Sequence, residues 1–392
     1  MKWEVEKRTK GGRKKFFLLL LAMSFLFLWS NEADAMGAEL SDDVAEELVT
    51  DMSFEQVQKL MDEMLGEESF SMETALKNMI SGKNVFSKEA VQDFLRSLFF
   101  DRIRQEQTNF IRILLLVLAA AVFSNFAAVF ENGQIGDVSF YMIYLLLFTI
   151  LMNSYQHLGI SLGKQLDWLT QFMKGLAPAY FTAVSAASGA LTAAAFYQGV
   201  LLLIWLVDWL LLSFILPGAN LYVLLCLVNH LSKEDMLSKM AELLETMISW
   251  SLKTMLGAVL GIQAVRGLVA PAMDAIKRTA IGKTAGAIPA VGNAVNVVTE
   301  LILTGALLVK NCLGTAAVVA LLLAGAGPVI HYGILSLSYR FLAAAAQPVS
   351  DKRIVGCLGT MGEGCAMLLR IMITAEVMCI LTFVILMASV GG

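Results

Sequence analysis

The feature that most constrains this chain is a series of long apolar stretches that begins near residue 109 and continues to the C-terminus. A helix needs about 20 consecutive apolar residues to cross the hydrocarbon core of a bilayer. Backbone groups inside a bilayer must be hydrogen-bonded within the protein, which favours helices. The sequence therefore predicts an all-α, polytopic bundle of membrane helices over 109–392. Its apolar stretches are 111–130, 138–155, 176–196, 200–231, 251–269, 285–309, 311–346 and 371–390.

Composition supports a membrane protein and argues against several other classes. The chain is 57% hydrophobic and only 16% charged, whereas soluble domains carry roughly 25% charged residues. A net charge of −4 offers no cationic field for nucleic acid. Five cysteines without a CxxC pair and three isolated histidines indicate neither a disulfide framework nor a metal site. We expect no cofactor and no nucleic-acid partner.

The N-terminus has the pattern of a signal peptide. A basic segment precedes the apolar run 16–29, which is 14 residues long and therefore short for a membrane span. Ala33-Asp34-Ala35 then offers a small-x-small cleavage site. We predict a signal peptide over 1–35, with an uncleaved signal anchor as the alternative. In both cases the following segment is delivered to the outer side of the membrane.

Residues 36–108 form an acidic segment with helical periodicity. They hold 16 acidic and 7 basic residues, a net charge of −9, whereas 109–392 carries a net charge of +2. Apolar residues recur at helical spacing around 54–65 and 72–80, and again after Ser87. We predict a small helical extracytoplasmic domain whose apolar stripes pack on each other. The alternative is a partner-binding module, because about 70 residues make a marginal core.

The membrane region contains an apparent internal repeat. Aligning 174–217 with 285–328 without gaps gives 12 identities in 44 positions, and the chain has only 6 prolines. The alignment matches two proline pairs and one Gly-x-x-Pro-Ala pair. This pattern predicts a duplication with halves of about 138–250 and 251–370.

The paired prolines predict interrupted membrane helices. Proline removes a helical hydrogen bond, and irregular backbone at membrane depth is tolerated only inside protein or beside water. In transporters, paired broken segments mark the binding site, although close packing of helices is an equally physical explanation. The candidate pathway or packing residues are Gly175, Pro178, Pro217, Gly286, Pro289 and Pro328.

Charged residues within the apolar stretches are few, namely Asp208, Glu300, Lys310 and Glu376. An ionised side chain at mid-membrane costs about 2.5–3.5 kcal/mol, so each is expected to face protein or water. Asp208 and Glu300 are added to the candidate pathway or packing residues. Lys310 lies near a predicted helix end and is expected to extend toward the interface.

Orientation follows from two signals that conflict. Signal cleavage places residue 36 outside, whereas the most basic connection, around Arg266 to Lys283, is expected in the cytoplasm. Counting every stretch as one span, with 200–231 divided at Pro217, puts that connection outside. The conflict disappears if 176–196 is a re-entrant hairpin, and 285–309 is open to the same interpretation. The predicted number of spans is about six to eight.

The C-terminal half resembles the stage III sporulation protein AE family of endospore-forming bacteria. The residues that carry the resemblance are Leu308-Val309-Lys310-Asn311, Gly314, Pro328, Tyr339-Arg340, Ala343-Ala344 and Gln347-Pro348. The resemblance implies a multi-pass subunit of a secretion-like channel complex that connects mother cell and forespore. It also implies a place in the mother-cell-derived outer forespore membrane, with the other membrane proteins of that complex as partners.

Three functions are compatible with these patterns to different degrees. The preferred one is a channel-complex subunit without chemistry of its own, because a secreted acidic module suits an assembly component. The alternative is a secondary transporter with its site at the paired proline segments. An intramembrane enzyme would need a zinc-binding HExxH motif or a Ser–Lys or Asp–Asp pair, and none is evident.

Overall fold

The computed structural model describes residues 49, 52, 54–65, 71–81, 88–127, 133–188, 190–231, 236–285 and 292–389. Regular structure within these residues is entirely helical, which confirms the predicted all-α class. The predicted signal peptide, 1–35, lies outside them. The elements are α3 (Glu55–Leu65), α4 (Met72–Ile80), α5 (Lys88–Ala127), α6 (Gly133–Ser188), α7 (Ala190–Leu210), η1 (Leu211–Ile215), α8 (Leu216–Leu231), α9 (Ser238–Ala285), α10 (Gly292–Ala346) and α11 (Lys352–Ser389).

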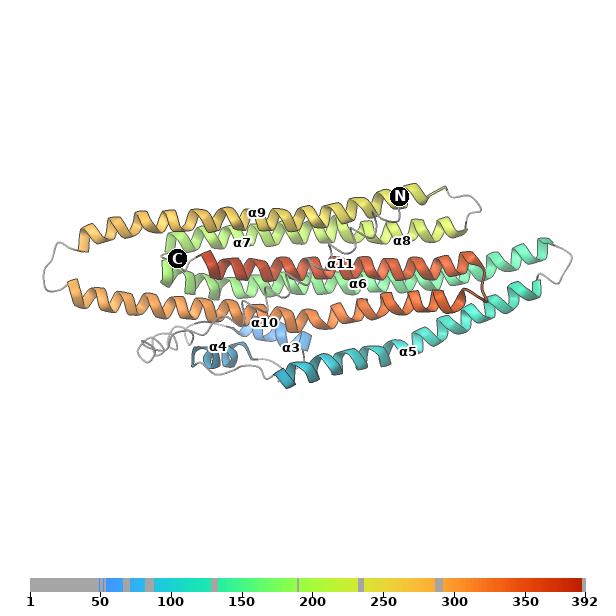
Figure 1. The fold of residues 1–392 in the computed structure, drawn as a ribbon, viewed down its shortest axis with the longest axis horizontal. Coiled ribbons are helices and arrows are strands. Elements are labelled where there is room, and N and C mark those ends of the chain that lie inside the picture. Colours follow the sequence, from blue (N-terminus) through green and yellow to red (C-terminus); the bar gives the residue numbers. More distant parts are fainter. Residues whose placement is uncertain are drawn as a thin grey trace, which may run out of the picture.

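The long helices α5 to α11 lie side by side and form one elongated bundle (Figure 1). Two contacts show that α6 runs antiparallel to the α7–α8 segment: Thr170 bonds to Asp208, and Tyr144 bonds to Leu227. Helices α10 and α11 form a second antiparallel pair, in which Lys310 meets Met387. Helix α11 also contacts α6, α8 and α9, so it is the central helix of the bundle.

Five helical segments of the described residues are long and apolar enough to cross a membrane. They are Tyr141–Ala186, Tyr197–Leu231, Ser238–Gly261, Ile302–Ala346 and Lys352–Ile385. The predicted polytopic character is therefore supported. Helix α6 has 56 residues and is roughly 84 Å long at about 1.5 Å per residue. A hydrocarbon core of roughly 30 Å covers less than half of that length.

The prediction that proline breaks these helices is wrong. Helix α10 continues through Pro328, and α6 continues through Pro178. Pro217 is the second residue of α8 and follows a π-helical turn, Leu211–Ile215, without a loop between them. The wider π turn accommodates the local change in hydrogen bonding, and packing against neighbouring helices keeps the axis continuous.

The predicted hairpin at 176–196 corresponds to the end of α6 and the start of α7. These residues form the tip of a long antiparallel pair rather than a short insertion. Under the 111-residue offset of the repeat, the tip should recur near Glu300, but α10 is continuous there. The two proposed halves therefore do not share helix boundaries, and the internal duplication stays a prediction from sequence.

The N-terminal helices pack on the bundle instead of forming a core of their own. Helices α3 and α4 begin and end close to the predicted ranges, but both contact α10, and α3 also contacts α6. Their apolar stripes, including Val57, Met61 and Leu76, are buried in these contacts. The predicted domain boundary at 108/109 falls inside α5, which continues from Lys88 to Ala127. A change in composition therefore does not coincide with a break in the helix.

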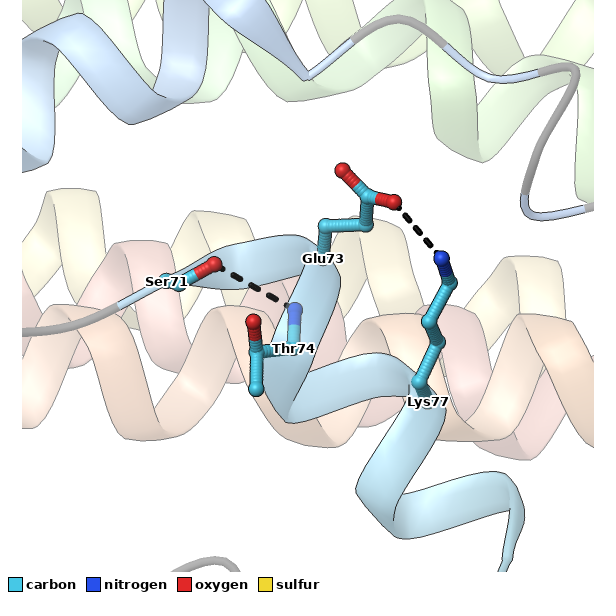
Figure 2. Close-up of polar contacts among 4 residues, drawn as sticks. All are labelled: Ser71, Glu73, Thr74 and Lys77. Atoms are coloured by element: carbon cyan, nitrogen blue, oxygen red, sulfur yellow. Dashed lines mark hydrogen bonds and ion pairs between the residues drawn. The ribbon is translucent and has the colours of Figure 1, made fainter.

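Helix α4 has a locally encoded start (Figure 2). The Ser71 hydroxyl accepts a hydrogen bond from the backbone N–H of Thr74 at 3.3 Å, which satisfies one free donor of the first turn. Glu73 pairs with Lys77 one turn later at 2.8 Å. The predicted capping serine of the preceding helix, Ser53, lies outside the described residues.

Glycines allow the central helix to approach its neighbours closely. A Cβ added at Gly364 of α11 would lie 2.6 Å from Val223 and 2.7 Å from Tyr155. A Cβ at Gly356 would lie 2.6 Å from His230. By contrast, a Cβ at Gly359 of the same helix meets no atom within 4 Å. The glycines of α11 therefore differ sharply in their importance for packing.

We expect Gly364→Ala to destabilise the protein by about 1–3 kcal/mol, because the methyl group overlaps two buried side chains. Gly359→Ala is the matched control and should be neutral or stabilising by up to about 1 kcal/mol through helix propensity. Thermal unfolding of the purified full-length protein in detergent measures both. Equal midpoints for the two variants would contradict this packing account.

Candidate functional site

Asp208 lies at a contact between two membrane-capable helices. It is half-buried on α7, and its Oδ1 accepts a hydrogen bond from the Thr170 hydroxyl of α6 at 3.0 Å. The sequence alone identified Asp208 as the most embedded carboxylate but named no partner for it. The structure supplies that partner, which pairs the carboxylate with a hydroxyl donor rather than a cation.

A small cavity of about 30 Å³ lies beside this pair. Its lining comes from four helices and is mostly apolar, with hydroxyls from Thr170 and Thr382 and the thiol of Cys379 as the polar groups. A cavity lined mainly by aliphatic side chains has few partners for water. Its lining residues are Thr170, Met173, Leu203, Ile204, Val207, Val259, Met378, Cys379 and Thr382. This cavity is suited to packing rather than to conduction of a polar solute.

Two charged side chains are buried more deeply than Asp208. Lys310 is fully buried, and its Nζ donates to the carbonyl oxygen of Met387 at 2.8 Å. That carbonyl is in the last turn of α11, where a cation interacts favourably with the helix end. The expectation that Lys310 extends to the interface is therefore wrong, because the C-terminal end of α11 covers it.

Glu376 of α11 is the second, with an exposed fraction of 7%. It was recognised in the sequence as a charge within an apolar stretch but was not included among the candidate residues. The signal that could have identified it is its spacing from Cys379 and Thr382, at i+3 and i+6 on the same helix. Its contact with α10, at Gly325, could not be derived from spacing.

Gly175 marks the place where α3 contacts α6. A Cβ added there would lie 3.4 Å from Val57 and 3.6 Å from Gln56, both of α3. Two turns earlier in α6, the indole N–H of Trp168 donates to the carbonyl of Leu60 at 2.8 Å. The Gly-x-x-Pro segment at 175–178 is therefore a packing surface for the N-terminal helix in this structure.

The other candidate residues do not come together at one site. Pro178 and Pro217 are exposed, whereas Pro328 is buried inside α10. Gly286 and Pro289 lie outside the described residues, and Glu300 is described only as part of α10. In the described part of the chain, no group of three or more His, Cys, Asp or Glu residues could hold a metal ion.

Comparison with known proteins identifies the family. The family model for stage III sporulation protein AE matches residues 70–390. The chain belongs to this family. It is also similar to stage III sporulation protein AE of Bacillus subtilis (strain 168), with 26% identity over 330 residues, which cover 83% of this chain and 82% of that protein. No solved structure matches the chain.

The match supports a role in sporulation and agrees with the sequence-based resemblance. It begins at residue 70, just before α4, and extends through α11. The α3 contact with Gly175 therefore joins a segment before the matched range to the matched helical body.

We expect Gly175→Leu to displace α3, because the larger side chain must occupy the position of Val57. Overpacking of this kind costs about 1–3 kcal/mol and should increase local opening about tenfold or more. Limited trypsin digestion at Lys59 would report the opening. Gly175→Ala is the control, since its methyl group makes only ordinary contact, and it should be cleaved at the wild-type rate. Wild-type cleavage of the leucine variant would show that α3 does not depend on this contact.

Proposed function

We propose that this protein is a multi-pass membrane subunit of a sporulation channel complex that connects the mother cell and the forespore. The observation that carries the proposal is the family match over residues 70–390, which includes every long helix of the bundle. The family name supplies the sporulation role. The connection between two compartments is our inference from the family resemblance and from the shape of the bundle.

The dimensions of the helices support this inference. Helix α6 and helix α10, with 56 and 55 residues, each extend roughly 80 Å or more. A bilayer core of roughly 30 Å leaves tens of ångströms of packed helix outside the lipid. A bundle that projects this far is suited to contact proteins in the space between two membranes. We propose that it lies in the mother-cell-derived outer forespore membrane, with residues 36–108 outside the cytoplasm.

The surface of the N-terminal helices offers a contact region for partners. Glu55 and Glu63 are exposed on α3 while the opposite stripe is buried against the bundle. The buried stripe holds α3 in place, which leaves the acidic side available. We propose that other membrane proteins of the same complex bind this acidic side.

A transporter with its site at paired proline segments is less well supported. Such a site requires interrupted helices around a shared polar cavity. Pro178 and Pro328 lie within continuous helices, and the cavity beside Asp208 is mostly apolar. The Asp208–Thr170 pair is the feature that such a transporter would use, and it is satisfied internally.

Reversing the acidic side should weaken partner binding without disturbing the fold. We expect the double variant Glu55→Lys and Glu63→Lys to recover several-fold less of its partner proteins on co-purification from sporulating cells. Lys59→Glu, on the same helix, is the control and should retain wild-type recovery. Forespore gene expression after engulfment should fall in the double variant only. Normal co-purification and normal expression in the double variant would contradict the proposed surface.

Orientation is tested separately by a single cysteine at residue 280, in a variant without the native cysteines. The basic segment around Arg266 to Lys283 is predicted to be cytoplasmic. A membrane-impermeant thiol reagent should therefore label Ala280→Cys only after the membrane is permeabilised. Labelling of intact cells would overturn this assignment.

A further inference from the structure

The carboxyl group of Glu376 lies directly against the backbone of α10. A Cβ added at Gly325 would collide with both carboxylate oxygens, so only glycine leaves room for this group. Glu376 is 7% exposed, and both residues belong to segments that are apolar enough to span a membrane. The carboxyl group is therefore enclosed between the two helices that form the tightest pair in the bundle.

The neighbouring backbone of α10 has a hydrogen-bond acceptor without its helical donor. In an α-helix, the N–H of residue 328 would bond to the carbonyl of residue 324. Residue 328 is proline and has no N–H, so the carbonyl of Ala324 loses that bond. Ala324 is adjacent to Gly325, where the carboxyl group of Glu376 lies. A protonated carboxyl group can donate a hydrogen bond to this oxygen, whereas an ionised one can only repel it.

The surroundings contain no cation that would stabilise an ionised Glu376. Among the described residues, Glu376 has no ion pair or hydrogen bond, and the α10 segment 321–328 contains no titratable residue. On its own helix, Cys379 lies within electrostatic range of Glu376, and Asp208 of α7 acts on the same thiol. Lys310 is 15 residues before Gly325 in α10 and bonds to Met387. An ionised carboxylate here would be buried, unpaired and near another carboxylate.

From this geometry we propose that Glu376 is a proton-binding site in the membrane body, whose neutral carboxyl group serves the carbonyl freed by Pro328. The bound proton links α11 to α10 at the position where α10 lacks a helical hydrogen bond. Loss of the proton places an unpaired negative charge in the contact and separates the helices at that level. The proposal does not depend on the partners or the channel role of the complex.

The test follows the thermal unfolding midpoint of the purified full-length protein from mildly acidic to alkaline buffer. The neutral form is the one that packs, so stability should be present at lower pH and decrease as the pH rises. Glu376→Gln retains a donor for the Ala324 carbonyl and carries no charge. We expect this variant to keep the acidic-buffer midpoint of the wild type and to lose the decrease at alkaline pH. Glu376→Met should also lose the pH dependence but unfold at a lower temperature, because it offers no donor.

Glu363→Gln is the matched control, since Glu363 is an exposed carboxylate of the same helix, bonded to Tyr222. It should retain the wild-type pH dependence. Infrared spectroscopy gives a second measurement, in which a protonated-carboxyl band of the wild type should disappear in Glu376→Gln. A pH response that persists in Glu376→Gln would overturn the proposal. The absence of the wild-type infrared band would also overturn it.

Discussion

The close contact between α10 and α11 is the interaction on which the rest of the bundle depends. In lipid, apolar side chains gain little from leaving the solvent, so helices associate through packing and hydrogen bonds. Glycines at 314, 325 and 362 each face a side chain or backbone atom of the opposite helix. With this pair in place, α11 presents Gly364 to α6 and α8, and Gly356 to α8. A single helix thereby positions most of the membrane body.

Polar groups inside this body are mostly paired with backbone carbonyls. The hydroxyl of Tyr144 donates to Leu227, that of Tyr332 to Leu158, and that of Ser336 to Gly362. Each bond joins two helices and satisfies a donor that would otherwise be costly to bury. Such bonds fix the relative positions of the helices without adding charge. Glu376 departs from this pattern, because its pairing with α10 requires a proton.

These features favour a rigid supporting body over a gated carrier. Continuous helices pass through the prolines, the cavity beside Asp208 is small and mostly apolar, and the N-terminal helices are packed on the bundle. A subunit of this kind suits an assembly that must hold a fixed geometry near two membranes. The acidic side of α3 and the proton-binding contact at Glu376 are the two places where the body could respond to its surroundings.

The amino-acid pattern was sufficient for the helical class, the membrane character, the ranges of α3 and α4, and the family. These depend on local periodicity and on the length of apolar stretches, which a single segment carries in itself. The effect of proline was misjudged, because a neighbouring π turn and surrounding helices at Pro217 keep the axis continuous. The burial of Lys310 was missed because its partner, Met387, is 77 residues away.

The roles of Gly175 and Glu376 depended on the folded arrangement. Gly175 contacts a helix more than 100 residues earlier in the chain, and the carboxyl of Glu376 meets a glycine about 50 residues before it. Spacing within one helix can show that a residue is small or charged and on which face it lies. It cannot show which other helix approaches that face, because long-range packing selects among many pairings of similar apolar surfaces. The chain thus encodes its elements locally, and its specific contacts arise where those elements meet.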